Sequence, residues 1–183
     1  INLGNMTTNS LTVNSTAGNI LFTGNTTSNT VTANANAGGI TQVGALNIAS
    51  TSTFRSGNAF STVLENPSNS FGGAVTLTQG LNNIIVSGSN FSLAAATCLS
   101  AANGTTTIRT VDTVNNQITI LGGNASGTTG LTANSAGNIV VSGGTFRNMT
   151  LTAANNITQT AGFGSNATVT RQSGGNVVRS NAS

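Results

Sequence analysis

A motif of about 20 residues recurs along this 183-residue chain and constrains its fold more than any other feature. Each copy has a Leu or Val followed by Thr, then a polar stretch, then Gly or Asn directly before a short aliphatic run. Copies begin at Leu11, Val31, Leu77, Leu131, Leu151 and Val169. The aliphatic anchors Ile20 and Ile40 are 20 positions apart, and Ile139, Ile157 and Val177 follow one another at 18 and 20 positions. Such spacing is typical of a solenoid in which each repeat forms one coil.

Composition favours strands and turns over helices. Asn, Thr, Ser and Gly contribute 28, 32, 20 and 23 residues, and all four are mediocre or poor helix formers. The chain is nevertheless 37% hydrophobic, with its aliphatic residues spread evenly in short runs, so it has apolar surface to bury in every repeat. We therefore predict an all-β fold, a parallel β-helix (β-solenoid) of about nine coils of roughly 20 residues, with residues 1–183 as a single repeat domain.

Stacking explains how such weak repeats form a stable fold. Alternate side chains of each short strand point inward, and coils that stack at about 4.8 Å share backbone hydrogen bonds and a continuous apolar column. Gly and Asn supply the tight backbone conformations needed at the corners, and Asn side chains at equivalent corners are expected to form ladders. About nine coils predict a rod roughly 40 to 45 Å long.

The middle of the chain, residues 45–125, repeats less regularly. The segment Glu65–Ser70 contains the single Pro and is predicted to be a protruding corner or loop, whereas Ala95–Asn103 is expected to form a short helical or irregular turn. Neither end of the sequence shows a charged or proline-bearing cap. Because both ends lie within repeat sequence, we expect the chain to be part of a longer polypeptide or a processed subunit that stacks in a filament.

The residues needed for catalysis are nearly absent. The chain has no His, and its two carboxylates, Glu65 and Asp112, are 47 positions apart in the sequence. At about 20 residues per coil this separation corresponds to roughly 11 Å along the solenoid axis, which exceeds the spacing of the carboxylate pair in either glycosidase class. Its Ser and Thr residues lack a His or Lys to activate them. Cys98 is the single Cys and is expected to be a buried thiol. We therefore predict no catalytic residues, no metal site and no cofactor, and a protein that is not an enzyme.

Charge and hydropathy exclude two further classes of partner. The five Arg residues and the net charge of +3 do not form the basic cluster with interleaved aromatics that nucleic-acid binding needs. No run approaches the roughly 18 apolar residues of a membrane-spanning helix. We expect neither nucleic-acid binding nor direct membrane insertion.

Two abundant short patterns occur about as often as chance predicts. Thr-x-Thr occurs seven times, against an expectation of five to six from the 32 Thr residues, so the count gives no support for ice binding. Ten Asn-x-Ser/Thr sequons compare with about eight expected by chance, so they do not indicate selection for glycosylation.

The repeat resembles those of the filamentous haemagglutinin-like exoproteins of bacterial two-partner secretion. The resemblance rests on the module Leu131–Ile139, on Asn155–Gly162 and on Asn69–Leu77. It implies a right-handed parallel β-helix, secretion through an outer-membrane transporter, and display or assembly at the bacterial surface.

Two functions fit these features. The first is a non-catalytic, extracellular structural or adhesive arm of filamentous-haemagglutinin type, whose partner is a glycan or protein on a host or neighbouring cell. The second is a subunit of an extracellular filament or sheath, whose partners are identical subunits that stack end to end. We expect an extracellular or bacterial cell-surface location in either case.

Overall fold

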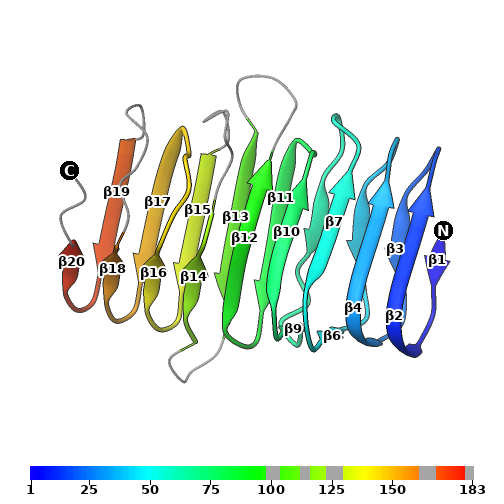
Figure 1. Cartoon of the computed structure of the whole chain (residues 1–183), viewed down its shortest axis with the longest axis horizontal. Coiled ribbons are helices and arrows are strands. Elements are labelled where there is room, and N and C mark those ends of the chain that lie inside the picture. The colour runs from blue at the N-terminus through cyan, green and yellow to red at the C-terminus, as the bar shows by residue number, and fades with distance from the viewer. Residues whose placement is uncertain (98–103, 112–115, 123–129, 161–167, 180–183) are drawn as a thin grey trace.

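The computed structural model describes residues 1–97, 104–111, 116–122, 130–160 and 168–179. In these ranges the chain forms 20 β-strands and no helix. The strands belong to two sheets, and every pair of neighbouring strands runs parallel (Figure 1). The predicted all-β parallel solenoid is therefore confirmed.

The chain passes back and forth between two sheets, here called sheet A and sheet B, and in two coils sheet B takes two successive strands, β6 with β7 and β9 with β10. Sheet A contains nine strands: β1 (Asn2–Leu3), β3 (Ile20–Phe22), β5 (Ile40–Gln42), β8 (Thr62–Leu64), β11 (Asn82–Ser87), β13 (Thr105–Thr110), β15 (Gly130–Ser135), β17 (Asn148–Ala153) and β19 (Thr168–Ser173). Sheet B contains eleven: β2 (Met6–Ser15), β4 (Thr26–Ala35), β6 (Leu46–Ile48), β7 (Ser52–Ser56), β9 (Ser70–Phe71), β10 (Ala74–Thr78), β12 (Phe91–Thr97), β14 (Ile118–Ile120), β16 (Ile139–Val141), β18 (Ile157–Gln159) and β20 (Val177–Arg179).

The coils stack into an elongated body with the N-terminal coil at one end (Figure 1). The nine strands of sheet A mark nine stacked levels, separated by eight turns of the chain, which agrees with the predicted coil number. In Figure 1 the strands of the nearer sheet point upward while successive coils advance from right to left. This geometry is a right-handed coil, the hand that parallel-strand crossovers almost always take.

Strand register confirms the spacing of the sequence repeat. Ile20 pairs with Ile40 in sheet A. Ile139 pairs with Ile157, and Ile157 pairs with Val177, in sheet B. Each of these partners occupies the same place in consecutive copies of the motif, so one repeat forms one coil.

The motif changes sheets between the two halves of the chain, which the sequence comparison alone did not reveal. In the N-terminal half, Leu11 lies on β2 of sheet B and Ile20 on β3 of sheet A. In the C-terminal half, Leu131 lies on β15 of sheet A and Ile139 on β16 of sheet B. The change follows β11, β12 and β13, which carry six or seven residues each, so both sheets have a long strand there. Both sheets need the same inward alternation, so either one accepts the motif.

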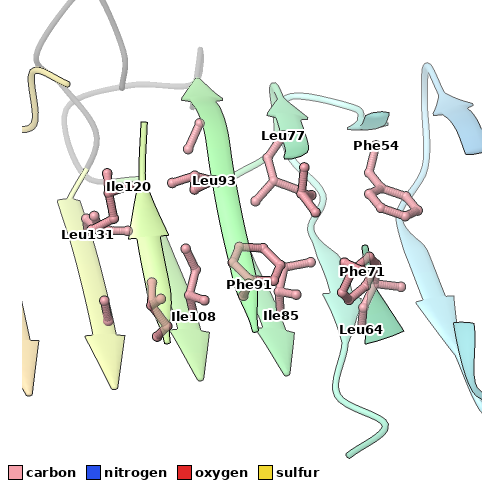
Figure 2. Packing of buried hydrophobic residues seen from close by; sticks show 14 of the residues in the cluster. Phe54, Leu64, Phe71, Leu77, Ile85, Phe91, Leu93, Ile108, Ile120 and Leu131 are labelled. Atoms are coloured by element: carbon pink, nitrogen blue, oxygen red, sulfur yellow. The ribbon is translucent and has the colours of Figure 1, made fainter. Parts of the chain in front are cut away.

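The core is a set of apolar columns between the two sheets. Alternate residues of the strands are buried, as in β16, where Ile139 and Val141 are fully buried and Val140 is not. Figure 2 shows Phe54, Phe71 and Phe91 pointing into this space. The rings of Phe54 and Phe71 meet edge to face with their centroids 6.4 Å apart, and those of Phe71 and Phe91 do so at 5.6 Å. Such T-shaped contacts add to the stabilisation from apolar burial.

Asn residues connect consecutive coils at the corners. The side-chain Oδ1 of Asn138 accepts a hydrogen bond from the backbone N–H of Asn156, and Oδ1 of Asn156 accepts one from Asn176. In return, Ile139 and Ile157 donate their backbone N–H groups to the carbonyl oxygens of Asn156 and Asn176. The corner Asn side chains thus connect the coils through the backbone, because each amide oxygen satisfies an N–H of the next coil, and they do not form the predicted ladder of stacked side-chain amides.

The segment Glu65–Ser70 agrees with the predicted protruding corner or loop except at Asn69. Glu65, Pro67 and Ser68 are exposed, but Asn69 is only 1% exposed. Its Oδ1 accepts hydrogen bonds from Gln42 Nε2 and the Leu46 N–H, at 2.8 and 2.9 Å. The end of the loop therefore lies inside the solenoid, where these partners satisfy the buried amide of Asn69.

Two further expectations are corrected. Ala95 to Thr97 belong to strand β12 and are not helical, because they pair with Thr76 to Thr78 of β10. Residues 98–103 lie outside the described ranges. No charged cap is expected from the sequence at either end of the solenoid. In the last strand of sheet A, however, Arg171 pairs in register with the buried Leu151. An arginine thus follows the apolar column at the C-terminal coil.

Candidate functional site

The residues considered for chemistry do not come together. Glu65 is exposed in the loop after β8, whereas Asp112 and Cys98 lie outside the described ranges. Among the residues that the structure describes, no group of three or more His, Cys, Asp or Glu side chains is placed to hold a metal ion. No helix in the same ranges is long and apolar enough to cross a membrane.

The Arg side chains are distributed over both sheets. Arg55 lies on β7 of sheet B and donates to the side-chain oxygen of Asn36, while the exposed Arg109 lies on β13 of sheet A. Arg171 and Arg179 lie on the last strands of the two sheets. Burial, together with repulsion from Arg179, holds the pKa of Arg171 below the usual arginine value.

A bend in sheet B creates the candidate binding site. Strands β2 and β4 are ten residues long, and their pairing is interrupted at Asn9 and Asn29. Beyond the bend, β6 and β9 continue the first half of β4, while β7 and β10 continue its second half. At the bend, the hydroxyls of Thr8 and Ser28 each donate to the carbonyl oxygen two residues ahead, so the same local turn is repeated in consecutive coils.

An open groove of about 400 Å³ lies at this bend and crosses four coils. Its lining consists of Thr8 and Asn9 from the first coil, Thr27, Ser28 and Asn29 from the second, Asn47, Ile48 and Ala49 from the third, and Ser70 and Gly72 from the fourth. A Cβ atom on Gly72 would lie 2.4 Å from the carbonyl oxygen of Ala49, so the last coil requires Gly in order to stack closely here. The volume is within the range of small-molecule binding sites.

The groove is lined by uncharged residues, and most of the surface that they expose within it is apolar. Asn9, Asn29 and Asn47 are exposed, and their side chains form no hydrogen bond with another residue in the described ranges. Asn14 and Asn34, farther along the same strands, instead bond to each other at 2.7 Å. The groove amides thus retain both donors and acceptors.

Two ladders of Thr residues are the other regular surface feature. On sheet B, Thr12, Thr32, Thr53 and Thr76 occupy consecutive paired positions. On sheet A, Thr107, Thr132, Thr150 and Thr170 do the same. Thr12 and Thr32 on sheet B, and Thr132 and Thr170 on sheet A, directly follow the Leu or Val that begins a copy of the motif, so this part of the ladder changes sheets together with the motif.

Comparison with known proteins finds a likeness for part of the chain. A family model described as "Repeats of unknown function (DUF5649)" matches residues 8–78. This range contains the whole groove and the sheet B ladder. Neither the curated proteins nor the solved structures include a significant match. The comparisons therefore identify a repeat sequence but assign no activity to it.

Sequence reasoning missed the groove although part of its signal was present. The polar residues Thr7, Thr27 and Asn47 follow one another at 20 positions, and the structure pairs them in this order. The period predicts that they form a row on the outer face. That the sheet bends beside this row depends on three-dimensional pairing, which the period does not specify.

Proposed function

We propose that this chain is a non-catalytic repeat arm of a secreted or surface-displayed bacterial adhesin, similar in organisation to filamentous haemagglutinin. The observation that carries the proposal is the continuity of the stack, in which columns of buried aliphatic residues extend through consecutive coils while Thr, Ser and Asn cover the outside. Such a body resists deformation through backbone hydrogen bonding and presents a neutral, hydrated surface. Both properties suit a spacer that displays binding surfaces away from a cell.

A bead-adhesion experiment tests this proposal. Beads coated with the purified chain are flowed over cultured epithelial cells and over bacterial lawns, and the retained beads are counted. We expect several-fold more retention than with albumin-coated beads. The matched control is the variant Ile139→Asp, which has the same composition elsewhere but lacks the folded surface. Equal retention of all three bead types on every surface would reject an adhesive role.

The filament reading is supported by one feature of the C-terminal coil and opposed by another. Val177, in register with the buried Ile157, is 44% exposed, and Val178 is 52% exposed, so a further coil would bury apolar surface there. However, a subunit stacked on this end would also cover Arg171, whose position continues the column of Leu151. Removing a charged guanidinium from water is costly, and this favours the arm over the filament.

Electron microscopy separates the two functions. Negatively stained samples at low and high protein concentration are expected to show isolated short rods. Uniform fibres that lengthen with concentration would support the filament subunit instead.

A further inference from the structure

We propose that the N-terminal end of the solenoid is a docking surface for the terminal coil of another chain of the same architecture, a parallel β-solenoid with an uncharged apolar column. The incoming coil stacks on β1 and β2 in the direction in which the coils of this chain stack on one another (Figure 1). The inference concerns how one arm joins to another solenoid, and it is independent of what the arm adheres to.

The edge of the first coil is long and carries neither charge nor proline. Among the described strands, β1 pairs only with β3, and the ten-residue β2 pairs only with β4. No charged side chain occurs before Arg55, and the single Pro is Pro67. Because natural proteins blunt their sheet edges with charge, proline or short strands, an unprotected edge of this length indicates a surface that pairs with another strand.

The apolar column is open at the same end. Leu3 and Leu11 are half-buried and pack against the core. Their partners one coil farther along, Phe22 and Val31, are at most 1% exposed. A coil stacked on the first one would therefore remove the remaining apolar surface of Leu3 and Leu11 from water, which is favourable.

Corner glycines of the following coil show how closely two coils approach. A Cβ atom on Gly24 would lie 2.2 Å from the backbone N of Asn5, and one on Gly38 would lie 2.4 Å from the carbonyl oxygen of Gly18. Both clashes are with the backbone of the coil before. Gly is therefore needed at these two corners wherever another coil stacks on the N-terminal side.

The first coil has Gly at the same two corners, although no described coil stacks in front of it. Gly4 and Gly18 precede Gly24 and Gly38 by 20 positions, which is one coil. A Cβ atom on Gly4 would have nothing within 4 Å, and one on Gly18 would meet only the Ser15 hydroxyl, at 3.9 Å. Neither glycine has a positive φ. Contacts within the chain thus do not require them, whereas a coil that stacks in the same direction requires both.

Charge excludes the chain's own C-terminal coil as the partner. Arg171 pairs with the buried Leu151, and Arg179 pairs with Gln159, which is 8% exposed, so both arginines hold column positions. The first coil has no Asp or Glu with which a guanidinium could form an ion pair. Because removing these charges from water is costly, the partner that fits is a solenoid whose terminal column is uncharged.

Surface plasmon resonance with an engineered partner tests the docking. The wild-type chain is immobilised through its C-terminal end, so that the first coil faces the solution. The probe is the same chain with Arg171→Leu and Arg179→Leu, which give it an uncharged terminal column, and with Gly4→Ala, which prevents probe molecules from stacking on one another. A second probe carries Gly4→Ala alone and keeps both arginines.

Two further immobilised surfaces carry Gly4→Ala or the matched control Gly130→Ala. A Cβ atom on Gly130 would make only ordinary contacts, the nearest at 3.5 Å, and Gly130 lies on β15, away from the first coil. Circular dichroism and thermal unfolding establish that every variant folds. The Gly4→Ala chain is expected to be as stable as the wild type, so a loss of binding on that surface reports the docking contact and not unfolding.

We expect the arginine-free probe to bind the wild-type and Gly130→Ala surfaces with affinities within about twofold of each other. Its affinity for the Gly4→Ala surface should be roughly tenfold lower or less, because the methyl group keeps the coils apart. The probe that keeps both arginines should bind the wild-type surface at least about tenfold more weakly than the arginine-free probe.

Three results would overturn the inference: no binding of the arginine-free probe to the wild-type surface, equal binding to the Gly4→Ala surface, or equal binding by the two probes. Equal binding by the two probes would indicate that the chains pair through another surface, such as the N-terminal ends of two copies. Bead retention on cells is measured separately, so a failure of docking leaves the adhesive function intact.

Discussion

At the scale of single residues, the abundance of Asn has a structural explanation. The motif places Asn before an aliphatic residue, and there the side chain accepts a backbone hydrogen bond from the coil stacked on it. The same arrangement joins Asn90 to the Gln117 N–H, while Phe91 donates to the Gln117 carbonyl. A residue with an amide oxygen close to its backbone is needed at such corners, and Asn has one. Much of the chain's unusual composition therefore serves to connect coils.

Asn69 is the residue at which we expect the largest effect of losing a side-chain amide. Replacing it with Leu keeps the number of side-chain heavy atoms but removes its paired bonds with Gln42 and leaves the Leu46 N–H without its partner. Because buried polar groups without partners each cost about 1–3 kcal/mol, Asn69→Leu should lower the free energy of unfolding by about 3 kcal/mol or more. Urea unfolding measures the loss. The exposed Asn148→Leu serves as the control, and an equal effect of both changes would contradict the buried placement of Asn69.

At the scale of elements, close stacking at one corner depends on glycine. A Cβ atom on Gly24 would lie 2.2 Å from the backbone N of Asn5, and one on Gly44 would lie 2.1 Å from the carbonyl carbon of Gly24. Gly4 belongs to the same row but has nothing within 4 Å of such an atom. The row thus contains its own control position.

We predict that Gly24→Ala lowers the free energy of unfolding by roughly 1–3 kcal/mol, because the coils must separate to admit the methyl group. Gly4→Ala should change it by less than about 0.5 kcal/mol, since its methyl group enters open space. Thermal and urea unfolding of the two variants provide the measurement. Similar losses in both would mean that the corner does not stack as described.

The alternation along β16 gives a second prediction at this scale. Ile139 is fully buried and Val140 is half-buried on the outer face. Ile139→Asp places an unpaired carboxylate in the apolar column and should abolish cooperative folding at neutral pH. Val140→Asp should cost no more than about 1 kcal/mol, since its carboxylate reaches water. Circular dichroism on heating distinguishes them, and a stable Ile139→Asp protein would show that the inward register is wrong.

Sequence periodicity predicted the coil but not every consequence of stacking. The spacing of Ile20 and Ile40 was enough to predict their pairing, because equivalent residues of successive coils must face each other. The change of the motif from sheet B to sheet A was not predictable, since both sheets impose the same alternation. Asn69 lies in a segment that is predicted to protrude because it contains the single Pro, and its burial depends on contacts with Gln42, which lies 27 positions away in the sequence.

At the scale of the whole molecule, we expect the charge at the C-terminal coil to limit end-to-end association. Arg171 continues the column of Ala133 and Leu151, and its guanidinium donates to the Gln159 side chain. We predict that Arg171→Leu leaves the thermal midpoint equal or higher and promotes end-to-end association at micromolar concentration, because an apolar column then continues to the last strand.

Sedimentation velocity over a concentration series measures this association. The control is Arg109→Leu, which removes the same charge from an exposed, outward position on β13. Association by both variants alike would mean that net charge, and not the end of the column, keeps the molecules apart. A monomeric Arg171→Leu protein would show that the arginine does not limit stacking.

The central claim is that one sequence repeat forms one stacked coil, and disulfide trapping tests it most directly. In a Cys98→Ser background, cysteines are placed at Thr132 and Thr150, which are paired neighbours, or at Thr132 and Thr170, which are two coils apart. Bridged cysteines need Cα atoms about 4.4–6.8 Å apart, whereas a two-coil separation is about 9.6 Å. The account predicts rapid, nearly complete oxidation of the first pair and little of the second. Equal oxidation of both pairs, or faster oxidation of the second, would contradict the stacked register.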